Sequence, residues 1–145
     1  MHLLKILLVI AALGGAYNFW VDWSTPSYAE VVAQIGSDNG FVPILPPDGA
    51  KADTVYVMAP KNCPSDAAQR AQQLAAGLES RGIPVERSDH FRAAVSDPTA
   101  EEREALKRTQ AVLNGAIPMV VVNGVASANP SVDQVEAEYR SVSNL

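Results

Sequence analysis

The sequence predicts an α/β domain preceded by an N-terminal membrane helix. Three observations support this class: an apolar stretch opens the chain, strand-like and helix-like segments alternate in its second half, and Asn123-Gly124 separates two short apolar runs. Alternating strands and helices are typical of a sheet covered by helices, and Asn-Gly between apolar runs indicates a hairpin. With 145 residues, the chain is long enough for one ordinary domain with its own core.

Residues 1–23 are predicted to be a membrane anchor or a signal sequence. The stretch from Leu3 to Val21 is apolar apart from Lys5 and Asn18, which is about long enough to cross a bilayer as a helix. Positive charge at the extreme N-terminus and Asp22 after the far end of this stretch orient the rest of the chain away from the cytoplasm. We therefore expect a single pass through the inner membrane and a domain on the periplasmic, extracytoplasmic side.

The two alternatives for this stretch differ in whether it is cleaved. Gly14 and Ala16 are the small residues that a signal-peptide cleavage site needs, whereas Trp20 and Trp23 fit the aromatic belt of an uncleaved helix. We expect the uncleaved anchor, because cleavage would leave several aromatic side chains exposed at the new N-terminus.

Two segments connect the anchor to the domain. Residues 24–36 are predicted to form a short amphipathic helix, with Thr25 as a possible N-cap and Pro26 in the first helical position, that lies on the membrane or packs on the domain. Residues 37–53 are rich in proline and glycine, which excludes a helix or a central strand and indicates an extended tether or a strap lying on the domain. The folded unit is expected to begin near Asp53.

Residues 54–145 are predicted to fold in the order β-α-β-α-β-β-α around a four-stranded mixed sheet. Short connections and right-handed crossovers make the first two strands parallel, and the hairpin adds an antiparallel pair with helices on both faces. The first helix should bury Ala67, Ala71, Leu74, Ala75 and Leu78. The expected strands are 54–59, 85–88, 119–122 and 125–128, and the expected helices are about 65–80, from the Asp97 cap to 113, and from the Ser131 cap onward.

The single cysteine, Cys63, lies between the first strand and the helix that follows it. A cysteine at a helix N-terminus faces unpaired N–H groups and the positive end of the helix dipole, which favour the thiolate. Lys61 favours the thiolate further, whereas the carboxylate of Asp66 disfavours it. One cysteine in an exported protein is buried and inert, paired with another molecule, or a free reactive thiol.

The element order, with Cys63-Pro64 at the first strand-to-helix turn and Ile117-Pro118 before the third strand, resembles the thioredoxin-fold superfamily in its compact glutaredoxin-like form. The resemblance implies that Pro118 is cis and lies beside Cys63. It also implies that the backbone of Ile117 is free to pair with an extended peptide or thiol substrate, with Pro64 and Ser65 beside it.

The sequence departs from that family at two places. The active-site motif reads CPSD, so Asp66 replaces the second cysteine; a monothiol still forms a mixed disulfide and passes it to a second thiol, but it cannot close its own disulfide. Glutaredoxins bind glutathione with a Gly-Gly and an acidic residue after the fourth strand, and residues 126–131 lack these features. No cofactor is therefore expected, although glutathione stays a possible ligand.

Other chemistry finds little support in the sequence. The net charge of −5 and the lack of a basic stripe argue against nucleic acid as a partner. His2 and His90 have no metal-ligand spacing with another ligand, so no metal site is expected. Asp89-His90 is an acid–base pair or a solvated surface pair.

Two functions stay open on this basis. The first is monothiol thiol–disulfide exchange through Cys63 with a thiol-containing protein. The second is a redox-inactive binding module, in which the groove between Cys63 and Pro118 holds an extended segment of an envelope protein.

Overall fold

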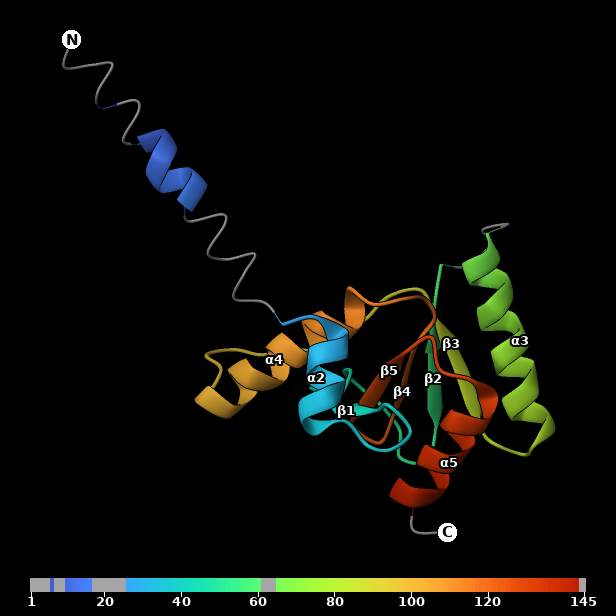
Figure 1. Cartoon of the computed structure of the whole chain (residues 1–145). Coiled ribbons are helices and arrows are strands. Elements are labelled where there is room, and N and C mark those ends of the chain that lie inside the picture. The colour runs from blue at the N-terminus through green and yellow to red at the C-terminus, as the bar shows by residue number, and fades with distance from the viewer. Residues whose placement is uncertain (1–5, 7–9, 17–25, 61–64, 144–145) are drawn as a thin grey trace.

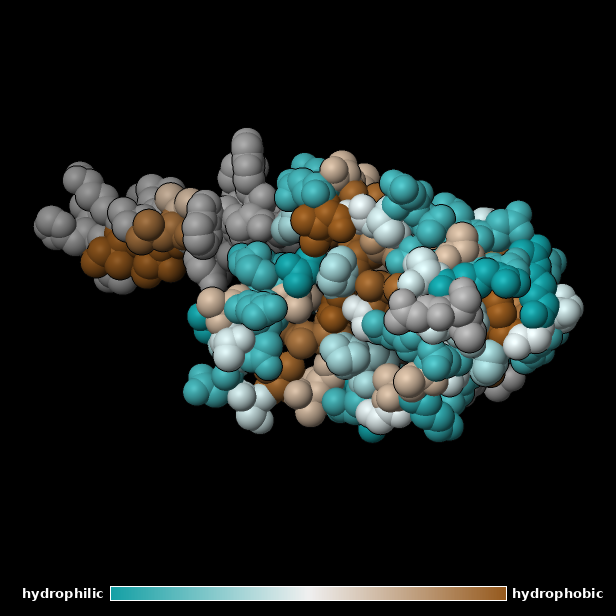
Figure 2. All heavy atoms as spheres, turned by 90° about the horizontal axis from the view of Figure 1, so that it is seen from below, coloured by the Kyte–Doolittle hydropathy of each residue, from teal (hydrophilic) through white to brown (hydrophobic). Residues whose placement is uncertain are grey.

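The computed structural model describes residue 6 and residues 10–16, 26–60 and 65–143. Residues 10–16 are helical, and the side chains of Ile10 and Leu13 are largely exposed. These residues are coloured as hydrophobic in Figure 2, whereas the domain surface seen there is mostly hydrophilic. Among the described residues, no helix has the length and apolar character needed to cross a membrane. Most of the predicted anchor or signal sequence, residues 1–23, lies outside them.

A five-stranded mixed sheet forms the centre of the α/β domain, in the order β1-β5-β4-β2-β3. β2 (Val55–Met58) pairs parallel with β3 (Val85–Ser88) and antiparallel with β4 (Met119–Val122), which pairs antiparallel with β5 (Val125–Ala128). The fifth strand, β1 (Val42–Pro43), pairs antiparallel with β5 at the edge. The predicted strand directions are confirmed, but the predicted count of four strands is wrong.

Four helices cover the two faces of this sheet (Figure 1). α3 and α5 pack on one face, where their buried side chains meet those of β2 and β4, namely Val55, Val57, Val120 and Val122. α2 and α4 pack on the other face, against Tyr56, Met58 and Met119. This division follows from strand alternation, which turns successive side chains to opposite faces. The helix bounds are Tyr28–Ile35 for α2, Asp66–Ser80 for α3, Ala100–Leu113 for α4 and Val132–Val142 for α5.

Side-chain hydroxyl groups cap the N-terminus of each of these four helices. The prediction of Ser131 as a cap is confirmed, but those of Thr25 and Asp97 are wrong, because Ser27 and Thr99 are the caps. Both of these residues have a glutamate three positions later, so each completes a capping box that satisfies two otherwise unpaired N–H groups.

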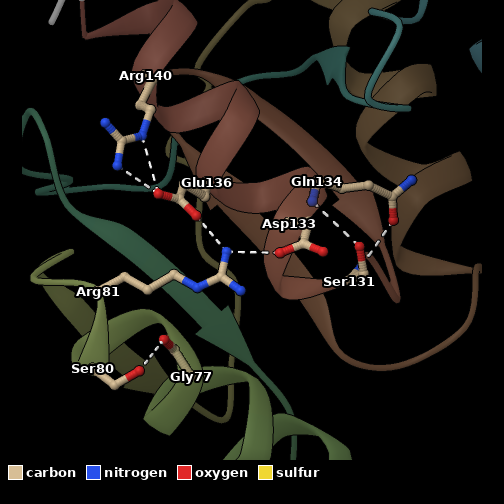
Figure 3. Close-up of polar contacts among 8 residues, drawn as sticks. All are labelled: Gly77, Ser80, Arg81, Ser131, Asp133, Gln134, Glu136 and Arg140. Atoms are coloured by element: carbon tan, nitrogen blue, oxygen red, sulfur yellow. Dashed lines mark hydrogen bonds and ion pairs between the residues drawn. The ribbon is translucent and has the colours of Figure 1, made fainter.

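The buried stripe of α3 differs from the prediction at one position. Ala68 is buried in place of Ala67, while the other four predicted positions are buried as expected. At the end of this helix, Arg81 forms an ion pair with Asp133, at 2.7 Å between Nη1 and Oδ1, and another with Glu136 (Figure 3). These contacts link the C-terminus of α3 to the first turns of α5.

The segment 37–53 is a strap that lies on the domain, which is the second of its two predicted alternatives. Phe41, Val42 and Ile44 expose 1%, 0% and 6% of their surface, because β1 carries them into the cores on the two faces of the sheet. The prediction that the folded unit begins near Asp53 is therefore wrong. Prolines exclude a central strand, but they allow the edge strand that forms here.

The helix predicted within 24–36 packs on the domain. α2 buries Val31 in the core shared with α4. The hydroxyl of Tyr28 donates to the carbonyl of Gly40 at 2.7 Å and lies 2.8 Å from the hydroxyl of Ser127, on β5. α2 and the strap are thus integral parts of the folded unit.

Polar side chains hold together the end of the sheet where β2 begins, which we call the clamped end. The backbone N–H of Asp53 donates to Oδ1 of Asn123 at 2.9 Å, and Nδ2 of Asn123 donates to Oδ1 of Asp53 at 3.2 Å and to the hydroxyl of Ser143 at 3.3 Å. Hydrogen bonds from Ser143 and then Asn123 lower the pKa of Asp53. Asn123 and Gly124 both have positive φ, as the predicted hairpin turn requires.

Candidate functional site

We call the opposite end of the sheet, where β2 ends and β4 begins, the open end, and it contains some of the residues that the sequence analysis selected. Ser65 and Ile117 both lie here, at the start of α3 and just before β4. Cys63, Pro64 and Lys61 lie outside the described residues.

The start of α3 is held by its own cap. The hydroxyl of Ser65 accepts a hydrogen bond from the N–H of Ala68 at 3.3 Å. Asp66 is exposed in the first helical turn, where its carboxylate interacts favourably with the helix dipole. Ser65 therefore acts as a helix cap, and its hydroxyl is partly committed to that role.

The turn before β4 agrees with the thioredoxin-fold resemblance in its peptide-bond geometry. It disagrees with the resemblance at the backbone carbonyl of Ile117. The Ile117–Pro118 peptide bond is cis, as expected. Pro118 is fully buried, and its carbonyl accepts from the N–H of Asn129 at 2.7 Å. The carbonyl of Ile117, however, accepts from Nη2 of Arg70 at 3.1 Å, so the expectation of a free Ile117 backbone is wrong for this carbonyl. Arg70 was not identified from the sequence.

A hollow of about 220 Å³ with a mainly apolar lining lies at the open end, and we call it the apolar hollow. Leu113 and Ile117 border it and keep 44% and 39% of their surface exposed. Gly115 lies in its wall, and a Cβ there would come within 2.6 Å of the Cβ of Ala128. The other apolar side chains in the lining are Met58, Ala59, Pro60, Phe91, Val112, Ala116 and Met119.

The loop after β3 adds an imidazole and a carboxylate to this hollow. Nδ1 of His90 lies 2.7 Å from Oδ1 of Asp89. Ser88 fixes the loop, since its hydroxyl donates to the carbonyl of His90 at 2.9 Å and accepts from the N–H of His90 at 3.3 Å. His90 also lines a larger polar hollow of about 440 Å³ between β3 and the strap.

A further hollow of about 210 Å³ lies between α3 and the start of α5. Its polar lining consists of Arg70, Gln73, Asn129 and Ser131. In the ranges that the structure describes, no group of three or more His, Cys, Asp or Glu side chains could hold a metal ion.

The open end therefore defines a class of site: a concave surface at the carboxyl ends of two parallel strands, where α/β sheets bind ligands. Comparisons of this chain with protein-family models, curated proteins and solved structures found no match. The function is accordingly argued from the residues of the open end.

Proposed function

We propose that this chain is a membrane-tethered, extracytoplasmic protein of the thioredoxin-like class that carries out monothiol thiol–disulfide exchange through Cys63. One observation carries the proposal: the β2-α3-β3-α4-β4-β5-α5 order brings the start of α3 and the Ile117-Pro118 turn together. The hydrogen bond from Arg70 to the Ile117 carbonyl joins these two elements. Residues 47 positions apart in the sequence thus meet, one on the first turns of α3 and the other just before β4.

The proposed chemistry needs only the thiolate of Cys63 and two partner sulfurs. The thiolate attacks a disulfide sulfur of the partner, a bond forms between the two sulfurs, and the other partner sulfur leaves as a thiolate. A second thiol then resolves the mixed disulfide. Backbone N–H groups at the start of α3 would stabilise the Cys63 thiolate, and Pro64, Ser65, Ile117 and Pro118 would contact the partner.

The proposed anchor places the domain close to the membrane. Only residues 24–27 separate the predicted anchor, residues 1–23, from α2, which packs on the domain. Four extended residues span about 14 Å. The partner would therefore be a membrane protein or an envelope protein within reach of the membrane surface.

Replacement of Cys63 tests this function directly. Cells that express Cys63→Ser or the original chain are quenched with an alkylating agent, and partner adducts are separated on non-reducing gels. We expect disulfide-linked adducts with the original chain and none with Cys63→Ser, while the control Ser80→Ala, at the far end of α3, keeps them. Because Cys63 is the only cysteine of the chain, Cys63→Ser sets the background of the gel, and an original chain that gives no adducts above this background would rule out the exchange reaction.

A second function, the redox-inactive binding module for an envelope protein, is favoured by the apolar hollow. Its rim residues Leu113 and Ile117 are exposed although apolar, which is a feature of interaction surfaces. This function predicts that Cys63→Ser still captures its partner under reducing conditions, whereas Ile117→Glu loses it. The opposite pattern would exclude the binding module.

A further inference from the structure

The polar hollow between β3 and the strap has a preformed frame. It has a volume of about 440 Å³, and Tyr56 and Met58 of β2 contribute to its lining. The N–H of Asp48, on the strap, donates to the carbonyl of Arg92 at 2.8 Å, and Oδ1 of Asp48 accepts from the N–H of Ala94 at 2.8 Å. The strap and the loop after β3 therefore hold each other in place around the hollow.

β3 leaves one edge of the sheet open beside this hollow. It is the last strand in the sheet order, and no described strand pairs with its outer side. The carbonyl of Pro84 accepts from the N–H of Val55 at 2.9 Å, and the carbonyl of Ser88 accepts from the N–H of Ala59 at 3.0 Å. Because alternate residues of β3 face β2, Arg87 turns its backbone N–H and C=O away from the sheet. Arg87 also lines the hollow, so a peptide that pairs with it lies beside the hollow.

The acidic side chains of the hollow already have donors, whereas two donors lack acceptors. Oδ1 of Asp48 accepts from a backbone N–H, and Oε2 of Glu86 lies 3.4 Å from Nζ of Lys51. Tyr56 is only 9% exposed, and its hydroxyl accepts from the N–H of Lys51 at 2.9 Å. Within the described part of the chain, the proton of this hydroxyl has no acceptor and the guanidinium of Arg92 has no partner. These two donors fit an anionic group.

The carboxylate at the end of an extended peptide satisfies these groups. Its oxygens can accept from Arg92 and Tyr56, and the peptide backbone can exchange two hydrogen bonds with Arg87. A second copy of this chain fits the edge less well. Pairing of two β3 strands about a two-fold axis places Arg87 opposite Arg87 or Glu86 opposite Glu86, and like charges directly opposite each other are destabilising.

We propose that the polar hollow binds the C-terminal end of an extended peptide, which adds to the outer edge of β3. The backbone of Arg87 pairs with the peptide, and Arg92 and Tyr56 hold its terminal carboxylate. In this mode of recognition, main-chain hydrogen bonds supply affinity and a neighbouring pocket supplies specificity. The site is separate from the proposed exchange reaction, because none of the residues that line the polar hollow takes part in that reaction.

An array of random hexapeptides tests the proposed ligand. Each peptide is attached by its N-terminus and made with either a free carboxylate or an amide at its C-terminus, and the array is probed with the whole chain in detergent. We expect a subset of the free-carboxylate peptides to bind, and their amide forms to bind at least about 10-fold more weakly, because hydrogen bonds to a charged group are lost. An array without any bound free-carboxylate peptide, or equal binding of the amide forms, would overturn the proposal.

Variants of the chain test the named residues by fluorescence anisotropy with the tightest peptide of the array. Arg92→Gln should weaken binding about 10-fold. The control Arg103→Gln removes the same charge from α4, away from the polar hollow, and should match the original chain.

Arg87→Pro tests the edge of β3. It removes the outward N–H, and an edge strand tolerates proline where the N–H makes no hydrogen bond in the sheet. We expect it to weaken binding about 10-fold more than Arg87→Ala, which removes the side chain and keeps the N–H. Undiminished binding by Arg92→Gln, or equal binding by Arg87→Pro and Arg87→Ala, would overturn the site.

Discussion

The two ends of the sheet are built differently, although the same pair of strands, β2 and β4, runs between them. At the clamped end, Asp53, Asn123 and Ser143 form a network of side-chain and backbone hydrogen bonds. The open end contains the apolar hollow, and Leu113 and Ile117 at its border keep much of their surface exposed. The clamped end therefore stabilises the fold, which leaves the open end available for binding and chemistry.

The largest expected difference concerns leucine side chains at the two ends. Leu78 is fully buried, near the turn that leads from α3 to the start of β3, whereas Leu113 is 44% exposed at the open end. We expect Leu78→Ala to lower the free energy of unfolding by about 3 kcal/mol, within the range for buried leucines, and Leu113→Ala by less than about 1 kcal/mol. Urea denaturation measures both, and equal losses would contradict the comparison.

The hydrogen-bond network of the clamped end is tested by replacing two asparagines, one at each end of the sheet, that both have positive φ. Asn123→Gly removes three hydrogen bonds at the clamped end while keeping the turn conformation accessible, and we expect a loss of about 1–2 kcal/mol. Asn129→Gly, at the open end, is the matched control and should change the free energy of unfolding by less than about 0.5 kcal/mol. A larger loss for Asn129→Gly would reverse the assignment of the two ends.

The smallest expected effect is electrostatic. Hydrogen bonds and ion pairs with Arg140 and then Arg81 lower the pKa of Glu136 from its ordinary value of 4.5. A carboxylate whose pKa is lower in the folded state stabilises the fold at pH values above its ordinary pKa. This contribution is lost as the pH falls through the folded-state pKa. Because both arginine side chains are exposed to solvent and the Glu136 side chain is only partly buried, Glu136→Gln should lower the Tm by only about 2 °C at pH 7 and by nothing at about pH 2. Thermal unfolding at both pH values checks this, and an equal change at both would contradict it.

Much of the fold could be predicted because its signals are local. The predicted bounds of β3, β4 and β5 agree with the structure, since Asn123-Gly124 separates the apolar runs of β4 and β5 and Ile83-Pro84 precedes β3. β1 could not be predicted, because a two-residue edge strand that contains Pro43 forms only by pairing with β5, more than 80 positions away. The burial of the strap depends on the same long-range contact.

The candidate site also has a part that could be predicted from the sequence and a part that could not. The positions of Ser65 and Ile117 at one end of the sheet follow from the element order, which the sequence predicts. The hydrogen bond from Arg70 to the Ile117 carbonyl and the apolar hollow arise where separate elements meet, and no local pattern marks them. Leu113 and Ile117 border the hollow, but their exposure is seen only in the structure.

The most direct test of the account is the rate of alkylation of Cys63 as a function of pH, measured on the whole chain. Because this is the only cysteine in the chain, the reaction reports on one thiol. A working exchange site predicts a midpoint well below the value of about 8.5 for a free cysteine, since an activated thiol is deprotonated near neutral pH. A midpoint at or above that value, or no reaction in the folded chain, would contradict the exchange reaction and leave the binding module as the function of the open end.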